Sequence, residues 1–277
     1  MQDIRIGVVQ MTSKVGDIAG NIDKTERFVK DAASKRVDLL CFPELSISGY
    51  NAGNTAMPTP ESFDGPSVAA LAAIASQYKI TLMAGLLERD ISGIVYNAQI
   101  VFGSEGVVGR YRKTHVPTTE IGTWRPGSDL QVFDHPKVRF GLEICYDSHF
   151  PEVSTELAES GAEILFFPHA SNGVESAMDK KARWLRYMPA RAYDNTVYIA
   201  VCNQVGDNGT GRNFAGVSFI CDTQGLIAAE SASSTDEQMV VADLKAVDLN
   251  KARSVPETFF RHFRRPEIYQ KWLRERS

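Results

Sequence analysis

Apolar residues along the first half of the chain follow two different spacings. Short, nearly continuous apolar runs bounded by turn residues are typical of strands, and apolar positions three or four residues apart are typical of amphipathic helices. The pattern predicts strands at residues 4–11, 37–42, 81–87, 98–102 and 107–111, and helices at residues 21–34 and 67–78. Because strands alternate with helices, we expect an α/β protein.

The second half of the chain repeats this order. Strands are predicted at residues 138–144, 162–167, 196–203, 216–221 and 226–229, and helices at residues 151–160 and 177–193. The segment Val-Asp-Leu-Leu-Cys-Phe-Pro-Glu (37–44) matches Ala-Glu-Ile-Leu-Phe-Phe-Pro-His (162–169), and the hairpin turn at Gly106 has a counterpart at Gly225. The repeat suggests two similar β-rich layers packed face to face, with helices outside. A chance similarity between two buried strands is the alternative.

Composition and charge narrow the class of protein. The chain has 277 residues, of which 43% are hydrophobic, enough for a large core, and no Pro/Gly/Ser-rich linker separates the halves. We therefore interpret residues 1–277 as one domain. The net charge of −4 gives no reason to expect a nucleic-acid partner. The chain has no run of about 18 apolar residues and begins with a charged segment (Asp3, Arg5), so we expect neither a membrane span nor a signal peptide.

The cysteine and histidine positions argue against disulfides and a metal cofactor and favour a cytoplasmic location. The four cysteines (Cys41, Cys145, Cys202, Cys221) are widely spaced without a CxxC pair, which favours reduced thiols in a cytoplasmic protein. The five histidines show no HxH or HxxxH pair, so we expect no metal. Because no GxGxxG or P-loop motif opens a helix, we expect no nucleotide cofactor either.

Three segments place a reactive side chain close behind an apolar strand, where open α/β sheets build their sites. They are Phe42-Pro-Glu44, Tyr111-Arg-Lys113-Thr-His115 and Gly141-Leu-Glu-Ile-Cys145-Tyr-Asp147. Each has a purely structural alternative: Glu44 as a helix N-cap partner, Lys113 as a solvated strand end, His115 as a structural histidine and Cys145 as an inert core residue. The turn after Cys145 resembles a nucleophile elbow, in which the sulfur is exposed beside backbone N–H groups. For each of these residues taken alone, the structural interpretation is the more common one.

Taken together, these segments resemble the nitrilase superfamily of carbon–nitrogen hydrolases, and the resemblance runs almost end to end. Further matching segments are Arg5-Ile-Gly-Val-Val-Gln10, Gly161-Ala-Glu-Ile164, Pro189-Ala-Arg-Ala-Tyr-Asp-Asn195, Phe214-Ala-Gly-Val-Ser218 and Arg264-Arg-Pro-Glu267. The resemblance implies a four-layer α-β-β-α sandwich with a pseudo-twofold repeat. It also implies a catalytic triad of Glu44, Lys113 and Cys145. Many members carry a second glutamate ahead of an aromatic-x-Pro-Gly element, which here is Glu120 before Trp124-Arg-Pro-Gly127.

These four side chains suit hydrolysis of a small amide through a thioester. Glu44 would take the proton of the Cys145 thiol and later give one to the leaving amine. Lys113 and the backbone N–H of Tyr146 would stabilise the oxyanion. A buried ammonium needs compensating carboxylates, which Glu44 and Glu120 provide.

Two rival functions leave part of this pattern unexplained. A Cys–His hydrolase using His149 or His169 would give Lys113 and Glu44 no role, so His149 is interpreted as capping or lining the site. A non-catalytic binding protein on this fold would be favoured if a triad position were replaced, and none is.

The residues after Cys145 favour one branch of the superfamily. Nitrilases proper usually place Trp-Glu there, whereas Tyr146-Asp147 resembles amidases and carbamoylases. Hydrolases of N-carbamoyl-D-amino acids tend to place arginines where this chain has Ser148 and His149. Relatives acting on N-carbamoyl polyamines share Phe150-Pro-Glu152 and the Arg-Arg-Pro tail. We therefore expect an amide or N-carbamoyl substrate, with a nitrile as the alternative.

The pocket is expected to include the loop 170–176 and the side chains of Tyr146, His149, His169 and Asn172. Asn172 would hydrogen-bond an amide, or else it is a turn residue before Gly173. Residues 256–277 form a tail with apolar anchors (Phe259, Phe260, Phe263, Ile268, Tyr269, Trp272, Leu273), which suggests packing on a partner subunit in a homo-oligomer. Folding back on the same subunit is the alternative. The basic residues of the tail are interspersed with acidic ones and favour a solvated helix or interface rim over a polyanion site.

Overall fold

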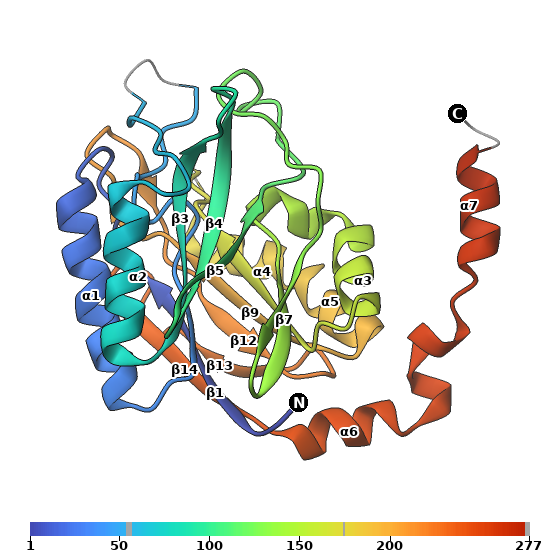
Figure 1. Cartoon of the computed structure of the whole chain (residues 1–277). Coiled ribbons are helices and arrows are strands. Elements are labelled where there is room, and N and C mark those ends of the chain that lie inside the picture. The colour runs from blue at the N-terminus through green and yellow to red at the C-terminus, as the bar shows by residue number, and fades with distance from the viewer. Residues whose placement is uncertain (54–56, 174, 275–277) are drawn as a thin grey trace.

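Two β-sheets stacked face to face form the centre of the protein, and helices cover their outer faces (Figure 1). The computed structural model describes residues 1–53, 57–173 and 175–274. Within these residues each of the two sheets has six strands, in the orders β14-β1-β2-β3-β4-β5 and β13-β12-β9-β8-β7-β6. The first sheet contains β1 (Ile4–Gln10), β2 (Leu39–Cys41), β3 (Thr81–Arg89), β4 (Val95–Gly103), β5 (Gly106–Arg112) and β14 (Gln238–Leu244). The second contains β6 (Val132–His135), β7 (Val138–Leu142), β8 (Ile164–His169), β9 (Tyr198–Asn203), β12 (Phe219–Cys221) and β13 (Ile227–Glu230).

The two sheets share one topology, which confirms the predicted repeat. In each sheet three neighbouring parallel strands, β1-β2-β3 and β7-β8-β9, are flanked by an antiparallel edge strand, β14 or β6. On the other side of each trio lies an antiparallel hairpin, β4-β5 or β12-β13. The hairpin turns at Gly106 and Gly225 therefore occupy equivalent places. A short ribbon of β10 (Gly206–Asp207) and β11 (Asn213–Phe214) lies between β9 and β12 in the chain.

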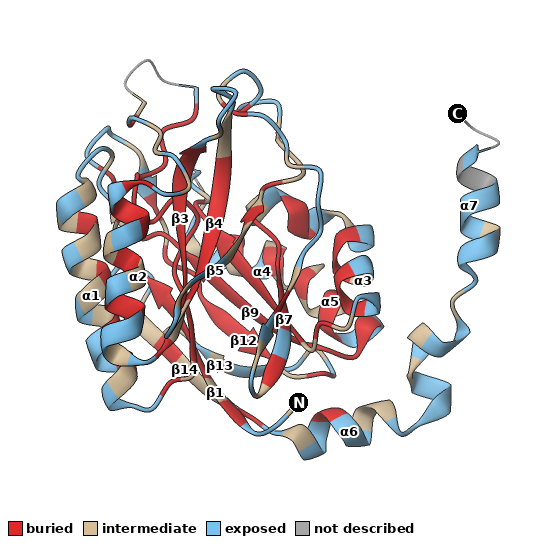
Figure 2. Cartoon of the chain, viewed as in Figure 1, coloured by how far each residue is buried: buried red, intermediate tan, exposed pale blue. Residues whose placement is uncertain are grey.

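Apolar side chains fill three layers, as the four-layer sandwich requires. Alternate residues of both sheets point inward and pack together, including Ile6, Phe140 and Phe166. The outward residues of the first sheet pack against α1 (Ile18–Ser34) and α2 (Pro66–Tyr78). Those of the second sheet pack against α3 (Pro151–Glu159), α4 (Ala177–Trp184) and α5 (Met188–Asn195). Figure 2 shows the strands largely buried and the outer sides of the helices exposed.

The predicted helix at residues 177–193 is in fact two helices, α4 and α5. The chain leaves α4 through a tight turn in which the Tyr187 N–H bonds the Trp184 carbonyl at 3.2 Å. Pro189 then stands in the first turn of α5. Proline lacks an N–H and clashes with the preceding helical turn, so a helix cannot continue through it. The break places Tyr187 beside His149.

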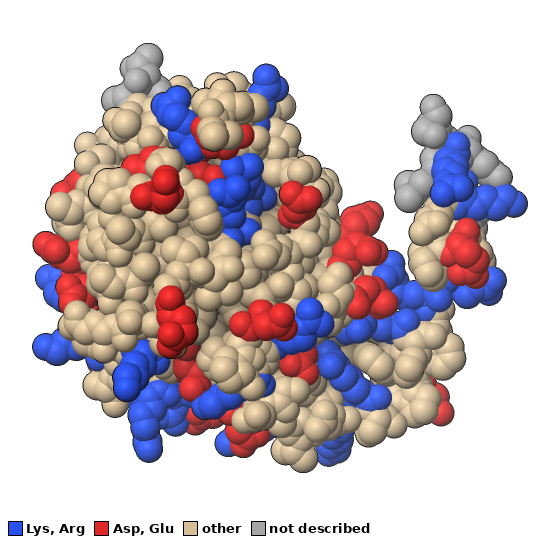
Figure 3. All heavy atoms as spheres, in the orientation of Figure 1, with Lys and Arg blue, Asp and Glu red and all other residues tan. Residues whose placement is uncertain are grey.

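The C-terminal segment extends away from the body of the molecule (Figure 1). It contains α6 (Ala246–Arg253), the 3₁₀ turns η2 (Pro256–Thr258) and η3 (Phe260–Phe263), and α7 (Pro266–Arg274). Positive and negative side chains are interspersed on the face seen in Figure 3, and basic ones are frequent along this segment. Glu275 and Arg276 of the predicted tail, and the side chains of Trp272 and Leu273, lie outside the described residues. In the described part of the chain, no helix is both long and apolar enough to cross a membrane.

Candidate active site

Three strand ends bring the predicted catalytic side chains to one edge of the stacked sheets. Glu44 follows β2, Cys145 follows β7, and Lys113 comes directly after β5. The carboxyl ends of parallel strands are where α/β sheets assemble their sites. Residues more than sixty positions apart in the sequence are thereby brought within contact distance, because Glu44 and Lys113 are separated by 69 positions and form a direct ion pair.

Lys113 links the two predicted glutamates. Its Nζ lies 2.8 Å from Glu44 Oε1 and 2.8 Å from Glu120 Oε2, and its side chain is fully buried. Burial disfavours the ammonium, but the negative charges of Glu44 and Glu120 outweigh that effect and raise the pKa of Lys113. The lysine is therefore a permanently charged group at the centre of the site.

Glu44 is held by hydrogen bonds from both halves of the fold. Its Oε1 accepts from Asn97 Nδ2 at 2.7 Å, and its Oε2 accepts from the Ala170 N–H at 2.8 Å. Gln204 Nε2 donates to the Glu44 carbonyl at 2.8 Å. The chain after Glu44 forms turns, and Leu45 adopts a left-handed φ of 50°. Because no helix starts within the described turn at residues 44–48, the N-cap alternative for Glu44 has no structural support.

Glu120 is fixed by an aromatic pair. Tyr50 Oη donates to Glu120 Oε1 at 2.8 Å, and Trp124 Nε1 donates to Glu120 Oε2 at 3.2 Å. The rings of Tyr50 and Trp124 pack edge to face, with their centroids 6.0 Å apart. Burial and the nearby Glu44 charge raise the pKa of Glu120, and Lys113 partly offsets them. The carboxyl group therefore has little freedom to move away from Lys113.

Cys145 adopts the conformation expected of a nucleophile elbow. It is the first residue of the 3₁₀ helix η1 (Cys145–His149) and has a left-handed φ of 50°. For a residue with a Cβ atom this conformation costs about 1–2 kcal/mol. Tyr146 follows in the first turn of η1, where N–H groups have no partner within the helix. The partly exposed cysteine is thus held in a strained conformation beside backbone donors.

Asp147 holds this elbow against the end of β5, which Lys113 directly follows. Its Oδ2 accepts from Tyr111 Oη at 2.8 Å and from the Ile144 N–H at 3.0 Å. Its Oδ1 accepts from Thr114 Oγ1 at 2.8 Å and from the His115 N–H at 2.7 Å. In the sequence, Asp147 indicated a branch of the superfamily, and its structural role was not predicted. Its position in the Ile-Cys-Tyr-Asp turn was the available signal.

The Cys145 thiol is poorly disposed to ionise before a substrate arrives. Burial raises its pKa, the nearby Glu44 and Glu120 charges raise it further, and Lys113 offsets only part of the effect. A thiol in this state becomes a nucleophile only when an adjacent base takes its proton. Glu44 is adjacent, since it belongs to the same charged cluster.

The predicted substrate-binding residues lie in different environments. His149 is exposed and stacks on Tyr187, with ring centroids 4.5 Å apart, while Tyr146 is partly exposed beside it. His169 is buried, with its Nδ1 2.8 Å from the Phe167 carbonyl, and burial lowers its pKa to about 3. Asn172 is exposed in the loop 170–176, of which Val174 lies outside the described residues. His169 is therefore a neutral core side chain at neutral pH.

The structure also shows the state of the four cysteines and how the possible metal ligands are arranged. The four cysteines, all within the described residues, are free thiols, and three of them are buried. Among the described residues no cluster of three or more His, Cys, Asp or Glu side chains is arranged to hold a metal ion.

Comparison with known proteins identifies the family. The family model for carbon–nitrogen hydrolases matches residues 5–254. The chain belongs to the carbon–nitrogen hydrolase family. This is the nitrilase superfamily that the sequence motifs suggested, and the chain resembles its amidases. The family name describes hydrolysis of carbon–nitrogen bonds.

Three relatives illustrate the range within this carbon–nitrogen hydrolase family. A probable nitrilase of Schizosaccharomyces pombe is 31% identical over 276 residues, covering 97% of this chain and 98% of its own. An (R)-stereoselective amidase of a Pseudomonas species is 30% identical over 250 residues, covering 90% of this chain and 88% of its own. The crystal structure of Saccharomyces cerevisiae Nit3, a member of branch 10 of the nitrilase superfamily, superposes with a TM-score of 0.80 at 27% identity. It covers 92% of this chain and 95% of that one.

Proposed function

We propose that this carbon–nitrogen hydrolase cleaves the C–N bond of a small amide or N-carbamoyl compound through a thioester on Cys145. The observation that carries the proposal is the fully buried Lys113, with its Nζ 2.8 Å from the carboxylates of Glu44 and Glu120. A buried cation held by two carboxylates contributes little to stability by itself. Beside a strained cysteine it suits stabilisation of an oxyanion.

In the first half of the reaction, Cys145 Sγ attacks the substrate carbonyl carbon while its proton passes to Glu44. The carbonyl oxygen becomes an oxyanion stabilised by Lys113 and by the Tyr146 N–H. Glu44 then gives the proton to the leaving nitrogen, the C–N bond breaks, and ammonia or an amine departs. The acyl group remains on Sγ as a thioester.

In the second half, water attacks the thioester carbonyl carbon while Glu44 accepts one of its protons. The same oxyanion donors stabilise the second tetrahedral intermediate. The C–S bond breaks, the acid leaves, and the proton returns to Sγ. Glu120 orients Lys113 and the substrate without transferring a proton, since hydrogen bonds from Tyr50 and Trp124 fix its carboxyl group.

An ammonia-release assay over primary amides, N-carbamoyl amines and nitriles tests the proposal. We expect amide or N-carbamoyl turnover in the wild-type chain and none in Cys145→Ala, because a methyl group cannot form a thioester. Intact-mass spectrometry during turnover should detect the acyl adduct on Cys145. Retained activity in Cys145→Ala, or an adduct on Cys41, Cys202 or Cys221 instead, would show that the nucleophile is wrongly assigned.

A further inference from the structure

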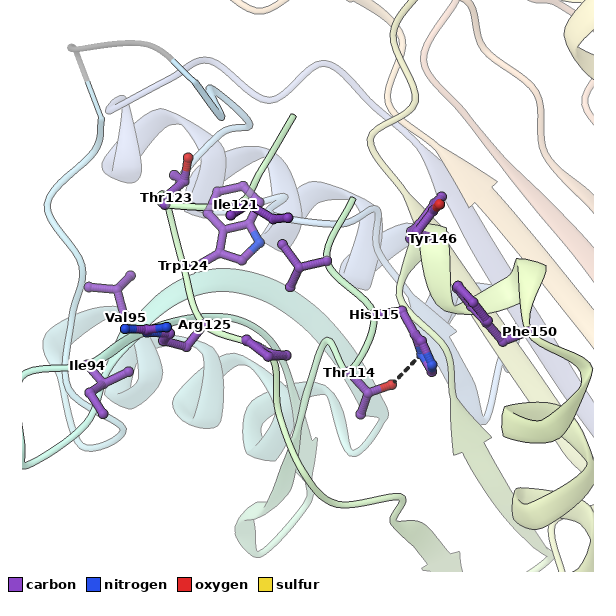
Figure 4. Close-up of a pocket in the computed structure, with 13 residues that line it drawn as sticks. Ile94, Val95, Thr114, His115, Ile121, Thr123, Trp124, Arg125, Tyr146 and Phe150 are labelled. Carbon is purple, nitrogen blue, oxygen red and sulfur yellow. Dashed lines mark hydrogen bonds between the residues drawn. The ribbon is translucent and has the colours of Figure 1, made fainter. Parts of the chain in front are cut away.

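A cavity of about 680 Å³ opens beside the catalytic cluster. Figure 4 shows it between two walls. One wall comes from the start of β4 and the loop after Glu120, and the other from the segments that follow Lys113 and Cys145. The lining includes Ile94, His115, Ile121, Trp124, Arg125 and Tyr146. Its volume falls in the range of small-molecule sites, about 300–1,000 Å³.

The lining is largely apolar and aromatic, and part of it is open to solvent. Ile121 is 67% exposed and Ile94 is 38% exposed, although both face the same cavity. Tyr146, another lining residue, is also exposed. Large apolar side chains that gather around one hollow leave a surface that an apolar ligand can cover.

The cavity shares its walls with the catalytic cluster. Trp124 lines it and donates a hydrogen bond from Nε1 to Glu120 Oε2 at 3.2 Å. Tyr146 lines it and follows Cys145 directly in the chain. His115 stacks on Phe150 with their ring centroids 3.8 Å apart, and its N–H bonds Asp147. A ligand in the cavity would therefore touch residues bonded to, or next to, the reacting groups.

We propose that this cavity binds an aryl or branched-alkyl group at the end of the amide substrate remote from the scissile bond. This inference rests on the proposed amide hydrolysis. Cys145 does not itself line the cavity, so the reacting carbonyl lies outside it and the bound group is remote from the scissile bond. The lining includes the cationic Arg125 but no carboxylate, so it disfavours a cationic group. Its aliphatic and aromatic side chains fit a neutral apolar group. Binding energy from such a remote group raises kcat/KM for substrates that carry it.

The experiment compares two amides with the same reacting centre, propionamide and 3-phenylpropionamide. We expect the wild-type chain to prefer the phenyl compound in kcat/KM. Ile121→Ser and Ile94→Ser should each lower that preference by about tenfold, because removing apolar contacts in a pocket typically changes discrimination by that order. Turnover of propionamide should stay near the wild-type value, since neither side chain belongs to the catalytic cluster.

Ile91→Ser is the matched control. Ile91 lies three positions before Ile94, is fully exposed, and does not line the cavity. It should leave the substrate preference unchanged. The proposal would be overturned if Ile94→Ser and Ile121→Ser lowered kcat/KM equally for both amides. It would also be overturned if Ile91→Ser lowered the preference for the phenyl compound to the same extent. Light scattering showing that the two cavity variants dissociate an oligomer while the preference stays at the wild-type value would overturn it as well.

A binding measurement separates this inference from the proposed function. 3-Phenylpropan-1-ol carries the phenyl group but no amide, and Trp124 in the cavity wall provides a fluorescence signal. The Kd for this alcohol should be about tenfold higher in Ile121→Ser than in the wild-type chain. In Ile91→Ser it should equal the wild-type value. If this shift is found but no amide is hydrolysed, the proposed function fails and the cavity site stands. If amides are hydrolysed but Ile121→Ser leaves the Kd unchanged, the cavity proposal fails alone.

Discussion

Lys113 carries its charge in a place where water cannot reach it, and two carboxylates balance that charge. An isolated buried ammonium would be strongly unfavourable, so removing either partner of such a cluster destabilises it by several kcal/mol, about 3–5 in measured cases. With Glu44 and Glu120 both ionised the cluster carries one net negative charge. In the proposed reaction, the oxyanion would add negative charge next to Lys113, the one cation among these three groups.

Replacing Lys113 therefore tests the electrostatic role directly. We expect Lys113→Ala to lower kcat by at least ~10²–10³, the usual effect of losing one oxyanion donor. The matched control is Lys181→Ala, which removes a partly exposed lysine paired with Glu230 on the surface. Steady-state kinetics with a good amide substrate measures both. Near-wild-type kcat in Lys113→Ala would mean that the triad is wrongly assigned.

Asp147, the residue that indicated the amidase branch in the sequence, also fixes the geometry of the elbow at Cys145. Its carboxylate accepts hydrogen bonds from Tyr111, Thr114 and the His115 N–H, and so sets the position of Cys145 relative to Lys113. Nitrilases proper usually have a tryptophan–glutamate pair after the cysteine. A nitrile also needs a proton delivered to its nitrogen before a thioimidate can form, whereas an amide forms an oxyanion that Lys113 can stabilise.

We therefore expect amide or N-carbamoyl hydrolysis to exceed nitrile hydrolysis. Matched amide and nitrile pairs with the same carbon skeleton give kcat/KM values that can be compared directly. The amide should be favoured in each pair. A preference for nitriles of about tenfold (~1.4 kcal/mol) or more across several skeletons would place the enzyme in the other branch.

Glu143 is a second buried carboxyl group, outside the proposed mechanism. It is fully buried and accepts a hydrogen bond from Ser154 Oγ at 2.6 Å. Burial raises the pKa of Glu143 well above its ordinary value, and the nearby Asp147 charge adds to the effect. The folded chain therefore keeps this proton at a pH where the unfolded chain has lost it. By linkage, stability should fall as pH rises from the ordinary glutamate pKa, about 4.3, toward the raised folded value.

Glu143→Gln should remove this part of the pH dependence. In the wild-type chain the group contributes a loss of up to about 1.4 kcal/mol per pH unit within that window. Urea unfolding at about pH 5 and pH 8 measures the difference in the free energy of unfolding. Glu105→Gln, at an exposed hairpin turn, is the control and should keep the wild-type dependence. If the free energy of unfolding of Glu143→Gln depended on pH as in the wild-type chain, Glu143 would be ionised in the folded chain.

Among the structural elements, β3 supports the turn that carries Glu44. The Gly85 carbonyl accepts from the Ile47 N–H at 2.8 Å, and the Gly85 N–H donates to Ser46 Oγ at 3.1 Å. A Cβ atom at position 85 would lie 2.4 Å from the Leu45 backbone nitrogen. Such a contact is with backbone and cannot be relieved by rotating a side chain. The strand and the turn must therefore separate if residue 85 is not glycine.

Gly85→Ala should consequently lower both stability and activity. Overpacking of this kind typically costs about 1–3 kcal/mol, and displacement of the turn would move Glu44 away from Lys113. Gly103→Ala is the control, because a Cβ there meets a Val108 methyl group at 3.2 Å, which can move. Thermal unfolding and kcat with a good amide give the two readouts. Equal losses of stability and kcat in Gly85→Ala and Gly103→Ala would contradict the role of β3 in supporting the turn that carries Glu44.

The central strands were predictable from sequence, whereas several edge elements were not. Runs such as residues 162–167 are buried on both faces and therefore read as continuous apolar segments. Strands β6 and β14 are edge strands of the two sheets with mixed burial, and neither was predicted. Helix α6 was also missed, because it buries little beyond Leu249 and so lacks an apolar stripe. The local hydrophobic pattern of a sequence indicates burial, and edge elements are little buried.

The identities of the candidate catalytic residues came from ordered motifs, but their supporting contacts did not. Glu44, Lys113, Glu120 and Cys145 were proposed from motifs, and Glu44, Lys113 and Glu120 lie in direct contact in the structure. The hydrogen bond from Asn97 to Glu44 spans 53 positions, and neither partner's local sequence indicates it. Contacts of this kind depend on sheet pairing, which a single sequence does not specify.

At the scale of the whole molecule, the internal repeat produces an asymmetric site. Phe42-Pro-Glu44 and Phe167-Pro-His169 end equivalent strands in the two halves. The first half provides a carboxylate at this position and the second a neutral imidazole. The chain after His169 is bound to the first half, because the Ala170 N–H donates to Glu44 Oε2. Each half thus provides part of the surroundings of Glu44.

The C-terminal segment packs partly on its own subunit. Arg261 Nε lies 3.1 Å from Glu159 Oε1, and Phe260 contacts Tyr193 with ring centroids 5.6 Å apart. This agrees in part with the alternative in which the tail folds back. Beyond η3 the chain leaves the body and α7 stands apart from it (Figure 1). Phe263 is 65% exposed and Tyr269 is 40% exposed.

We predict that this exposed segment packs on another copy of the chain. Apolar side chains repeated along an extended tail are unfavourable in water, and a symmetric partner offers an identical surface to cover them. Light scattering at micromolar concentration should therefore give at least about twice the 30.6 kDa of one chain. Phe263→Ser should weaken the association, while Val247→Ser, which removes an exposed apolar side chain on α6, should not. A wild-type mass of about one chain would refute the oligomer. An oligomer unaffected by Phe263→Ser would place the contact elsewhere on the molecule.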